Sequence, residues 1–258
     1  MKVVKFMNLV RRRAIFKPDK RMMIPYNYNH DVMKAIYYYI SIADKQQEKF
    51  LHEEGYRVED GHRFKLFNFA LRFSGANFQK DYIEIDKNSN VILVLSGVDE
   101  IINSILRGLL HIKQIRIEES NIPLTDIKKD GFKPFRNIML FKTLSPVVTT
   151  TKADNGYILS LRPFVDKYYI NLAENLMKKY RLIYEEVFDG PLYFDISDVL
   201  NMKEKSHRIK GIYKIGYLYD MWIETTPKMQ RIIYYLGLGE NNSTGAGCMD
   251  ILMVGDSI

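Results

Sequence analysis

The sequence predicts an α+β fold made of two tandem ferredoxin-like (RRM-like) units and ending in a glycine-rich loop. Two observations predict it. In residues 3–118 the apolar patterns follow the order strand, helix, two strands, helix, strand, which is the ferredoxin-like arrangement. A second, similar series begins near residue 138, and a length of 258 residues suits one large domain or two small ones. No sequence repeat relates the two halves.

The first half begins with a strand over residues 3–9. Arg11, Arg12 and Arg13 follow, and such a charge run indicates a solvated loop before it indicates phosphate contact. Residues 24–28 predict a turn into a helix, whose apolar positions continue to Ala43. Asp44 has the form of a helix N-cap with Gln47 three residues later, so we predict a break there and a second short helix over 45–53. The other expected elements are a polar loop at 55–61, strands at 64–71, 82–85, 91–95 and 112–118, and a helix over 99–110.

The second half is separated by a predicted linker over residues 123–133, whose signals are mixed. The division predicted on this basis is a first domain over 1–125 and a second over 126–258. The second domain is expected to contain strands at 138–141, 147–151, 191–200, 214–219 and 249–254, and helices at 164–184 and 227–236.

Composition limits the class of protein. Hydrophobic residues make up 47% of the chain, enough for a packed core, and 38 basic residues against 31 acidic ones give a formal charge of +7. This moderate excess favours a polyanionic partner without distinguishing RNA from DNA or a membrane surface. Cys248 is the single cysteine, which excludes an internal disulfide and fits a reducing, cytoplasmic location. No apolar run approaches the roughly 18 residues that a membrane span needs.

Four glycines, Gly237, Gly239, Gly245 and Gly247, bracket a polar segment between the last predicted helix and the last predicted strand. Glycine reaches positive φ and lets another backbone approach closely. Such a loop can present a row of bare N–H groups that bind an anion. A helix C-cap followed by a tight turn is the alternative. Two Gly-x-Gly pairs around one polar segment favour the anion-binding interpretation.

This loop resembles the glycine-rich signature of the Cas6 family, the CRISPR RNA-processing endoribonucleases within the wider group of repeat-associated RNA-binding proteins. The signature is Gly-apolar-Gly, a short polar spacer, then Gly-aromatic-Gly before the last strand. Ala246 stands where an aromatic residue is common, so base stacking is not expected from that position. Four further segments resemble the family in the same order along the chain: the Pro-x-Asn start at 25–27 with its following helix, and residues 50–53, 65–67 and 144–147.

The resemblance implies three catalytic residues, namely Tyr37 in the first helix, His52 in the segment 50–53, and Lys65. Tyr37 and His52 are 15 residues apart, which is about 22 Å along an unbroken helix and too far to share one phosphate. The break predicted near Asp44 would fold His52 back toward Tyr37. His30, His62, His111 and His207 are rivals for the role of His52, and His30 is the strongest because it lies at the start of the helix.

The chemistry that these residues suit is metal-independent cleavage of RNA, in which the 2′-hydroxyl attacks the neighbouring phosphate. An imidazole titrates near pH 6.5 and suits proton transfer, so His52 is the candidate for that step. Lys65 is suited to stabilise the charge of the transition state. The phenol of Tyr37, with a reference pKa near 10, is a better hydrogen-bond partner for the 2′-hydroxyl than a base. The sequence does not assign the acid and the base. Each residue also has an ordinary structural interpretation, and their joint spacing together with the glycine loop favours the catalytic one.

A second group of candidates is expected to bind RNA. Residues 203–210 are the densest basic segment, and they lead into a strand, so they predict a hairpin that either grips phosphates or is simply solvated. The RNA-binding residues predicted from this segment and from the glycine loop are Lys203, Lys205, Arg208, Lys210, Gly237, Gly239, Asn241, Ser243, Gly245 and Gly247.

The expected partner is CRISPR repeat RNA within a precursor transcript; other effector subunits and a second copy of the chain are further partners that the resemblance leaves open. We expect no cofactor and no metal site, because the histidines lack zinc-ligand spacing and the chain has no phosphate-binding Gly-x-x-x-x-Gly-Lys-Ser/Thr loop. Two other functions compete with catalysis: a non-catalytic RNA-binding scaffold subunit of the same fold, and a basic protein with no RNA preference.

Overall fold

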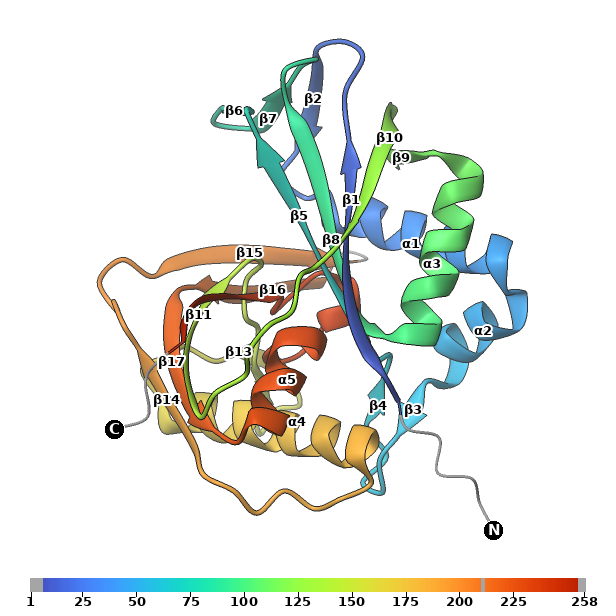
Figure 1. Cartoon of the computed structure of the whole chain (residues 1–258). Helices are drawn as coiled ribbons and strands as arrows, with labels where there is room; N and C mark the ends of the chain where they lie inside the picture. The colour runs from blue at the N-terminus through green and yellow to red at the C-terminus, as the bar shows by residue number, and fades with distance from the viewer. Residues whose placement is uncertain (1–6, 210–211, 255–258) are drawn as a thin grey trace.

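The computed structural model describes residues 7–209 and 212–254 and contains two main antiparallel sheets (Figure 1). The first sheet has the strand order β5-β8-β1-β10-β9 and is formed mainly by the first half of the chain. Its strands are β1 (Leu9–Phe16), β5 (Phe67–Ser74), β8 (Asn90–Val98), β9 (Gln114–Ile117) and β10 (Ser120–Lys129). Two helices, α1 (Asn29–Ala43) and α3 (Asp99–Ile112), lie together on one side of this sheet (Figure 1).

The packing of α1 against α3 explains why both helices form. Each buries an apolar stripe at helical spacing, Val32, Ile36 and Ile40 in α1 and Ile101, Ile105 and Leu109 in α3. Their backbones also approach very closely: a Cβ atom on Gly108 would lie 1.9 Å from the carbonyl oxygen of Tyr39. Glycine is therefore required where the two helices cross.

The second sheet has the strand order β14-β17-β11-β18 and belongs to the second half of the chain. Its strands are β11 (Ile138–Thr143), β14 (Leu192–Ile196), β17 (Asp220–Thr225) and β18 (Met249–Val254), and its helices are α4 (Asp166–Tyr184) and α5 (Pro227–Leu236). If the four strands are numbered by their order along the chain, their order across the sheet is second, third, first, fourth. The strands β1, β5, β8 and β10 of the first sheet, numbered in the same way, have the same order across their sheet.

Smaller sheets and turns connect these layers. They are the sheet β2 (Met22–Pro25), β7 (Tyr82–Ile85) and β6 (Asn77–Phe78); the hairpins β3 (Tyr56–Arg57) with β4 (Arg63–Phe64), β12 (Thr150–Lys152) with β13 (Ile158–Ser160), and β15 (Lys203–Ile209) with β16 (Ile212–Leu218); the helices α2 (Lys45–Lys49) and η1 (Phe50–Glu54); and the 3₁₀ turn η2 (Asn242–Thr244).

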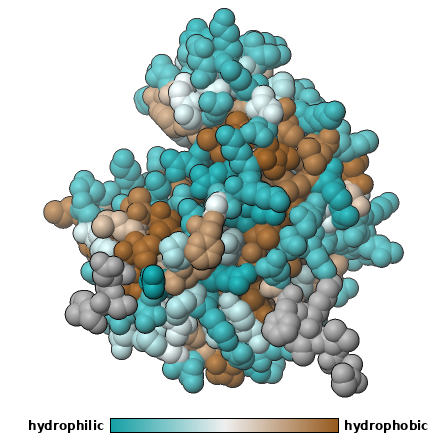
Figure 2. All heavy atoms as spheres, in the orientation of Figure 1, coloured by the Kyte–Doolittle hydropathy of each residue, from teal (hydrophilic) through white to brown (hydrophobic). Residues whose placement is uncertain are grey.

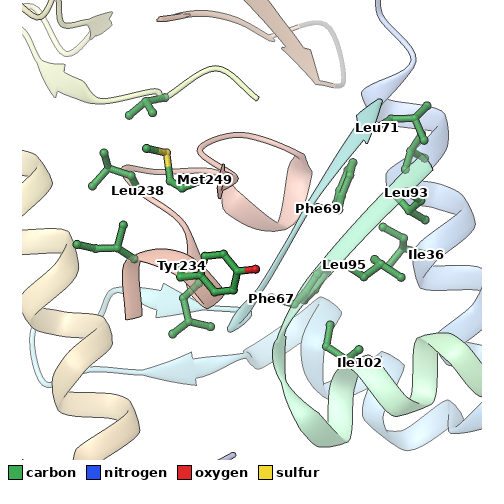
Figure 3. Close-up of a cluster of buried hydrophobic side chains, with 14 of the residues drawn as sticks. Ile36, Phe67, Phe69, Leu71, Leu93, Leu95, Ile102, Tyr234, Leu238 and Met249 are labelled. Atoms are coloured by element: carbon green, nitrogen blue, oxygen red, sulfur yellow. The ribbon is translucent and has the colours of Figure 1, made fainter. Parts of the chain in front are cut away.

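The two halves share one hydrophobic core. Phe67 and Phe69 of β5 belong to the same buried cluster as Tyr234 of α5, Leu238 of the glycine loop and Met249 of β18. Figure 3 shows these side chains between the two groups of elements, with Ile36 of α1 beyond β5. Since burial of apolar surface is the main favourable term in folding, this shared core holds the halves in a fixed relation.

Several expected elements are confirmed. The helix over 227–236 and the strand over 249–254 have the predicted bounds, and α3, α4, β7 and β11 agree within a few residues. Thr226 caps α5 by accepting a hydrogen bond from the Met229 N–H, and Pro227 occupies the first turn, where its missing N–H costs nothing. No helix among the described residues is long and apolar enough to cross a membrane. Figure 2 shows hydrophilic residues over much of one face, with hydrophobic residues gathered in separate patches.

The interpretation of Arg11, Arg12 and Arg13 as a solvated loop is wrong. All three lie in β1, the central strand that pairs with both β8 and β10. Arg11 is fully buried, its guanidinium stacks 3.6 Å above the Tyr234 ring, and it lies 3.6 Å from the carboxylate of Asp250. A charge run can enter a strand when distant segments supply partners for it. Residues 3–6, most of the strand predicted over 3–9, lie outside the described residues.

Two other expectations are also wrong. The linker predicted over residues 123–133 is largely strand, because β10 runs to Lys129 and pairs with β1 as far as Arg12. The continuous strand predicted over residues 64–71 is interrupted at Lys65 and Leu66, where Leu66 takes a positive φ of 52°. No element was predicted over residues 220–225, where the structure has the strand β17.

Candidate active site

Tyr37 and His52 are brought together by the chain break at Asp44. The helix α1 ends at Ala43, Asp44 takes an extended conformation, and α2 starts at Lys45. The Asp44 carboxylate accepts a hydrogen bond from the Gln47 N–H at 2.9 Å, as the predicted N-cap requires. The rings of Tyr37 and His52 then lie edge to face with centroids 6.1 Å apart. The predicted break and the predicted approach of these two residues are both confirmed.

His52 lies in a π-helical turn, η1, which the sequence did not predict. The N–H of Gly55 donates to the carbonyl of Phe50 at 2.8 Å, which closes the wider turn. Within it Leu51 is fully buried, whereas the neighbouring His52 side chain is exposed. Such turns are short because their geometry is unfavourable, and they occur frequently at functional sites. The buried leucine anchors the turn and leaves the imidazole accessible from solvent.

Lys65 reaches the same turn from the other direction. It occupies the short break between β4 and β5, and its ammonium donates hydrogen bonds to the carbonyls of Leu51 and His52, the second at 3.4 Å. The positive φ of Leu66 ends the hairpin strand at this point. The structure therefore places Tyr37, His52 and Lys65 together, although they come from a helix, a π-helical turn and a loop.

The environment changes the acidity of two of these groups. Burial raises the pKa of Tyr37 to about 12, and the nearby carboxylate of Glu48 adds to the shift. Burial lowers the pKa of Lys65, and the neighbouring Arg63 acts in the same direction. At neutral pH Tyr37 is thus a neutral phenol that can donate a hydrogen bond, and not a base.

A cleft of about 550 Å³ lies between the two halves of the molecule, and of the three candidate residues Lys65 lines it, whereas Tyr37 and His52 do not. Lys65 and Phe67 line it, and the Phe67 ring also contacts that of Tyr37 with centroids 6.2 Å apart. The cleft is bounded by β4 and β5, by α4, by the hairpin β12–β13 and by the glycine loop. Its basic lining residues are Arg63, Lys65, Lys152, Lys178 and Lys179, and its acidic ones are Glu174 and Glu240.

Most backbone N–H groups of the glycine loop donate to carbonyls of the loop itself or of neighbouring segments. The N–H groups of Gly237, Leu238, Glu240, Thr244, Gly245, Ala246 and Gly247 all donate to backbone carbonyls. The expected row of bare N–H groups is therefore not present at these positions. A Cβ atom on Gly247 would lie 1.8 Å from the Leu238 carbonyl oxygen, and Gly247 has a φ of 66°, so the two arms of the loop meet there. The bracketing glycines let the loop close on itself.

The four glycines are buried, and the polar segment between them is partly exposed. Asn241 and Ser243 line the cleft, whereas Gly245 packs against the Phe69 ring of β5, where a Cβ atom would lie 2.7 Å away. Ala246 is also fully buried, so the position where an aromatic residue is common in the family faces the core here.

Lys179 of α4 is a residue that sequence analysis missed. Its side chain is buried, and its ammonium donates to the carbonyls of Gly237 and Gly239, at 2.9 and 3.2 Å, and to Oδ1 of Asn242 at 2.7 Å. Burial lowers its pKa to about 7, and the carboxylate of Glu240 opposes that shift. Asn242 in turn donates to the carbonyls of Leu238 and Ala246, so it bridges the arms of the loop. The one sequence signal for this role was the position of Lys179, on the face of the predicted helix over residues 164–184 that also carries its apolar residues.

The basic hairpin β15–β16 extends toward the first half of the chain. Lys203 and Lys205 lie in β15 and are exposed, and the Lys205 ammonium lies 6.0 Å from the ring centroid of Tyr26. Arg208 also lies in β15, paired with Tyr213. Lys210 lies outside the described residues. The structure does not place this hairpin among the residues that line the cleft.

The rival histidines lie elsewhere, with one exception. His62 lines the cleft, and its Nδ1 lies 2.9 Å from Oδ1 of Asp60, which also pairs with Lys178 at 2.7 Å. His30 lines a different cleft, beside α1 and β9, His111 lies in the last turn of α3, and His207 lies in β15. Among the described residues, no three histidine, cysteine, aspartate or glutamate side chains gather closely enough to hold a metal ion.

Comparison with known proteins finds similarity over nearly the whole chain. Residues 23–128 match the family model described as CRISPR-associated protein Cas6, N-terminal, and residues 128–251 match that described as CRISPR associated protein Cas6, C-terminal. The chain is 28% identical over 243 residues to the CRISPR-associated endoribonuclease Cas6 1 of Methanocaldococcus jannaschii, covering 89% of this chain and 87% of that protein. It is 25% identical over 236 residues to the CRISPR-associated endoribonuclease Cas6 of Pyrococcus furiosus, covering 90% and 85%.

A solved structure described as CRISPR associated protein Cas6 has the same overall fold. It superposes with a TM-score of 0.79 at 27% sequence identity, covering 95% of this chain and all of that one. The α+β class predicted from the sequence is thus confirmed.

Proposed function

The chain belongs to the family of CRISPR associated protein Cas6, whose two models together match residues 23–251, and we propose that it cleaves CRISPR repeat RNA within precursor transcripts as an endoribonuclease. The observation that carries the catalytic part of this proposal is the edge-to-face contact of Tyr37 with His52, whose carbonyl accepts a hydrogen bond from Lys65. A proton carrier, a hydrogen-bond donor and a cation lie together, and the cation lines a basic cleft; cleavage of a phosphodiester requires groups of these kinds.

The reaction we propose is attack of the 2′-hydroxyl on the adjacent phosphate, without a metal ion. The exposed imidazole of His52 transfers a proton at the 2′-oxygen or at the leaving 5′-oxygen. The Tyr37 phenol, held neutral by burial, donates a hydrogen bond that orients the reacting groups. The Lys65 ammonium stabilises the negative charge that builds up on the phosphate. The products are a 2′,3′-cyclic phosphate or 3′-phosphate and a 5′-hydroxyl.

We propose further that the RNA enters the cleft between the halves. The partly exposed residues Asn241 and Ser243 line the cleft and are in position to contact the RNA, while Gly237, Gly239, Gly245 and Gly247 contribute by shaping the loop. We infer that Lys203, Lys205, Arg208 and Lys210 hold a more distant part of the transcript through its phosphates. The matching order of four strands in each sheet supports two tandem ferredoxin-like units, and the proposed division near residues 125–126 lies within β10.

The test is incubation of end-labelled repeat RNA with the protein in excess chelator, followed by mapping of the product ends. Cleavage at one position per repeat, with a 5′-hydroxyl on the downstream fragment, is expected. Tight binding of the repeat without cleavage in any buffer would instead assign the chain as a non-catalytic RNA-binding scaffold. Equal competition by unrelated RNA and duplex DNA would identify a general basic protein and contradict the proposal.

A further inference from the structure

Two asparagine side chains in the cleft each have one buried polar atom without a hydrogen-bond partner in the described part of the chain. Oδ1 of Asn175 and Nδ2 of Asn241 are shielded from solvent and make no hydrogen bond, although both residues line the cleft. Buried polar atoms are nearly always paired, so each such atom calls for a reason. Two other asparagines of the same cleft are satisfied by the protein itself, since Asn171 donates to the Thr150 carbonyl at 2.8 Å and Asn242 bridges the glycine loop.

The two amides lie in one neighbourhood of the cleft. Asn175 comes one helical turn before Lys179 on the same face of α4, since residues four apart are neighbours on a helix surface. Lys179 binds Oδ1 of Asn242, and Asn242 directly follows Asn241. The wall formed by α4 and the wall formed by the glycine loop therefore each contribute one amide with unused hydrogen-bonding capacity.

An amide suits a nucleobase better than a phosphate. It carries a donor and an acceptor side by side, and each base presents its own arrangement of donors and acceptors along its edges. A phosphate offers acceptors only, and the cleft already supplies cations for it in Lys65, Lys152 and Lys178. The terminal torsion of asparagine has a broad energy profile, so each amide can turn to meet a base that enters.

We propose that Asn175 and Asn241 together read the identity of one nucleobase near the scissile bond, and so set the sequence preference of the cleavage reaction. The assignment rests on the proposed function of the cleft. Asn175 had no place in the predicted site, because a single polar residue within a long helix carries no signal of its own. A good bidentate contact between an amide and a base discriminates against the wrong base by roughly tenfold or more.

The experiment measures single-turnover cleavage of repeat RNAs in which each position is changed in turn to the other three nucleotides. Wild type is expected to discriminate at least about tenfold at one position near the cut. Asn175→Ala and Asn241→Ala should both flatten the preference at that same position and leave the preferences elsewhere intact. Glu174→Ala is the matched control, because Glu174 lines the same cleft from the same helix and is exposed, and alanine adds no amide; it should retain the full preference.

Other results overturn the proposal in recognisable ways. A uniform decrease for all RNAs in Asn175→Ala, with an unchanged melting temperature, would assign a contact to the ribose or phosphate backbone. Unchanged selectivity would remove Asn175 from recognition altogether. If Asn175→Ala fails to fold, Asn175→Ser keeps a small polar group and replaces it. If wild type binds the RNAs without cutting them, the same comparison is made from binding constants, so failure of catalysis and failure of base reading remain distinguishable.

Discussion

The buried ammonium of Lys179 in α4 lies 2.7 Å from Oδ1 of Asn242 in the glycine loop and also binds the Gly237 and Gly239 carbonyls. One side chain thus fixes the loop that forms a wall of the proposed RNA cleft. Without it, three oxygen acceptors lose a charged donor inside the protein, where an unsatisfied group is costly.

Replacement of Lys179 by methionine is therefore expected to lower the free energy of unfolding by roughly 2 kcal/mol. The measurement is urea denaturation at pH 8, above the pKa of about 7 that burial gives this lysine. The fold disfavours the charged form, so at lower pH the cost of burying the charge would offset the loss of the hydrogen bonds. Lys178→Met is the matched control. Lys178 pairs with Asp60 at the surface, and such an exposed pair contributes little to stability. Equal losses in the two variants would show that Lys179 does not anchor the loop.

Replacement of His52 by alanine is expected to slow single-turnover cleavage of repeat RNA by about 10²- to 10⁴-fold. Binding should change little, because the imidazole is exposed and holds no other element in place. His62→Ala is the control, since His62 lines the same cleft and is paired with Asp60. If His62→Ala abolishes cleavage and His52→Ala does not, the catalytic role passes to His62.

Replacement of Asp44 by alanine removes the N-cap of α2 and is expected to cost about 1 kcal/mol of stability. It should also slow cleavage by up to about 100-fold, because the break at Asp44 sets the distance between Tyr37 and His52. Asp44→Asn keeps an equally good capping oxygen and should retain both stability and rate. Similar rates in Asp44→Ala and wild type would mean that the cap does not determine the position of His52.

The stability of the protein should fall as the pH rises above 10, and Tyr37 should account for part of the loss. Its pKa is about 12 in the folded chain and near 10 in the unfolded chain. Between these values the unfolded chain releases a proton that the folded chain retains, which favours unfolding. At pH 11 this contribution is about 1 kcal/mol.

The measurement compares chemical denaturation at pH 9 and pH 11, without RNA. Tyr37→Phe should lose less stability between these two pH values than wild type does. Tyr38→Phe, which changes an exposed neighbouring tyrosine, should behave as wild type. An identical loss in Tyr37→Phe and wild type would show that Tyr37 is not desolvated in solution.

Local signals were sufficient for much of the fold. The N-cap at Asp44 is complete within four residues, and so is the start of α5 at Thr226 and Pro227, which is why both could be predicted. The approach of Tyr37 to His52 followed from that break. The identity of the three proposed catalytic residues came from the resemblance to a family, because a tyrosine, a histidine and a lysine in separate elements carry no pattern that links them.

Signals that depend on distant partners were not visible in the sequence. Arg11 lies in a run of charges, yet it is buried because Tyr234 and Asp250, more than 200 residues away, provide a ring face and a carboxylate. The expected linker became β10 because β1 offered it an unpaired edge. In each case the segment itself was ambiguous, and pairing with another segment decided its conformation.

By itself the sequence determined the α+β class, the order and bounds of the elements with strong local signals, and the break that folds His52 back toward Tyr37. Only the tertiary structure decided that most backbone N–H groups of the glycine loop donate to backbone carbonyls of the loop and of neighbouring segments, that Lys179 holds the loop, and that Asn175 and Asn241 line one cleft. The physical reason is the separation along the chain between the groups that interact. Caps, periodicity and glycine torsions act within a few residues, whereas the burial of a polar group depends on which remote segments supply its partners.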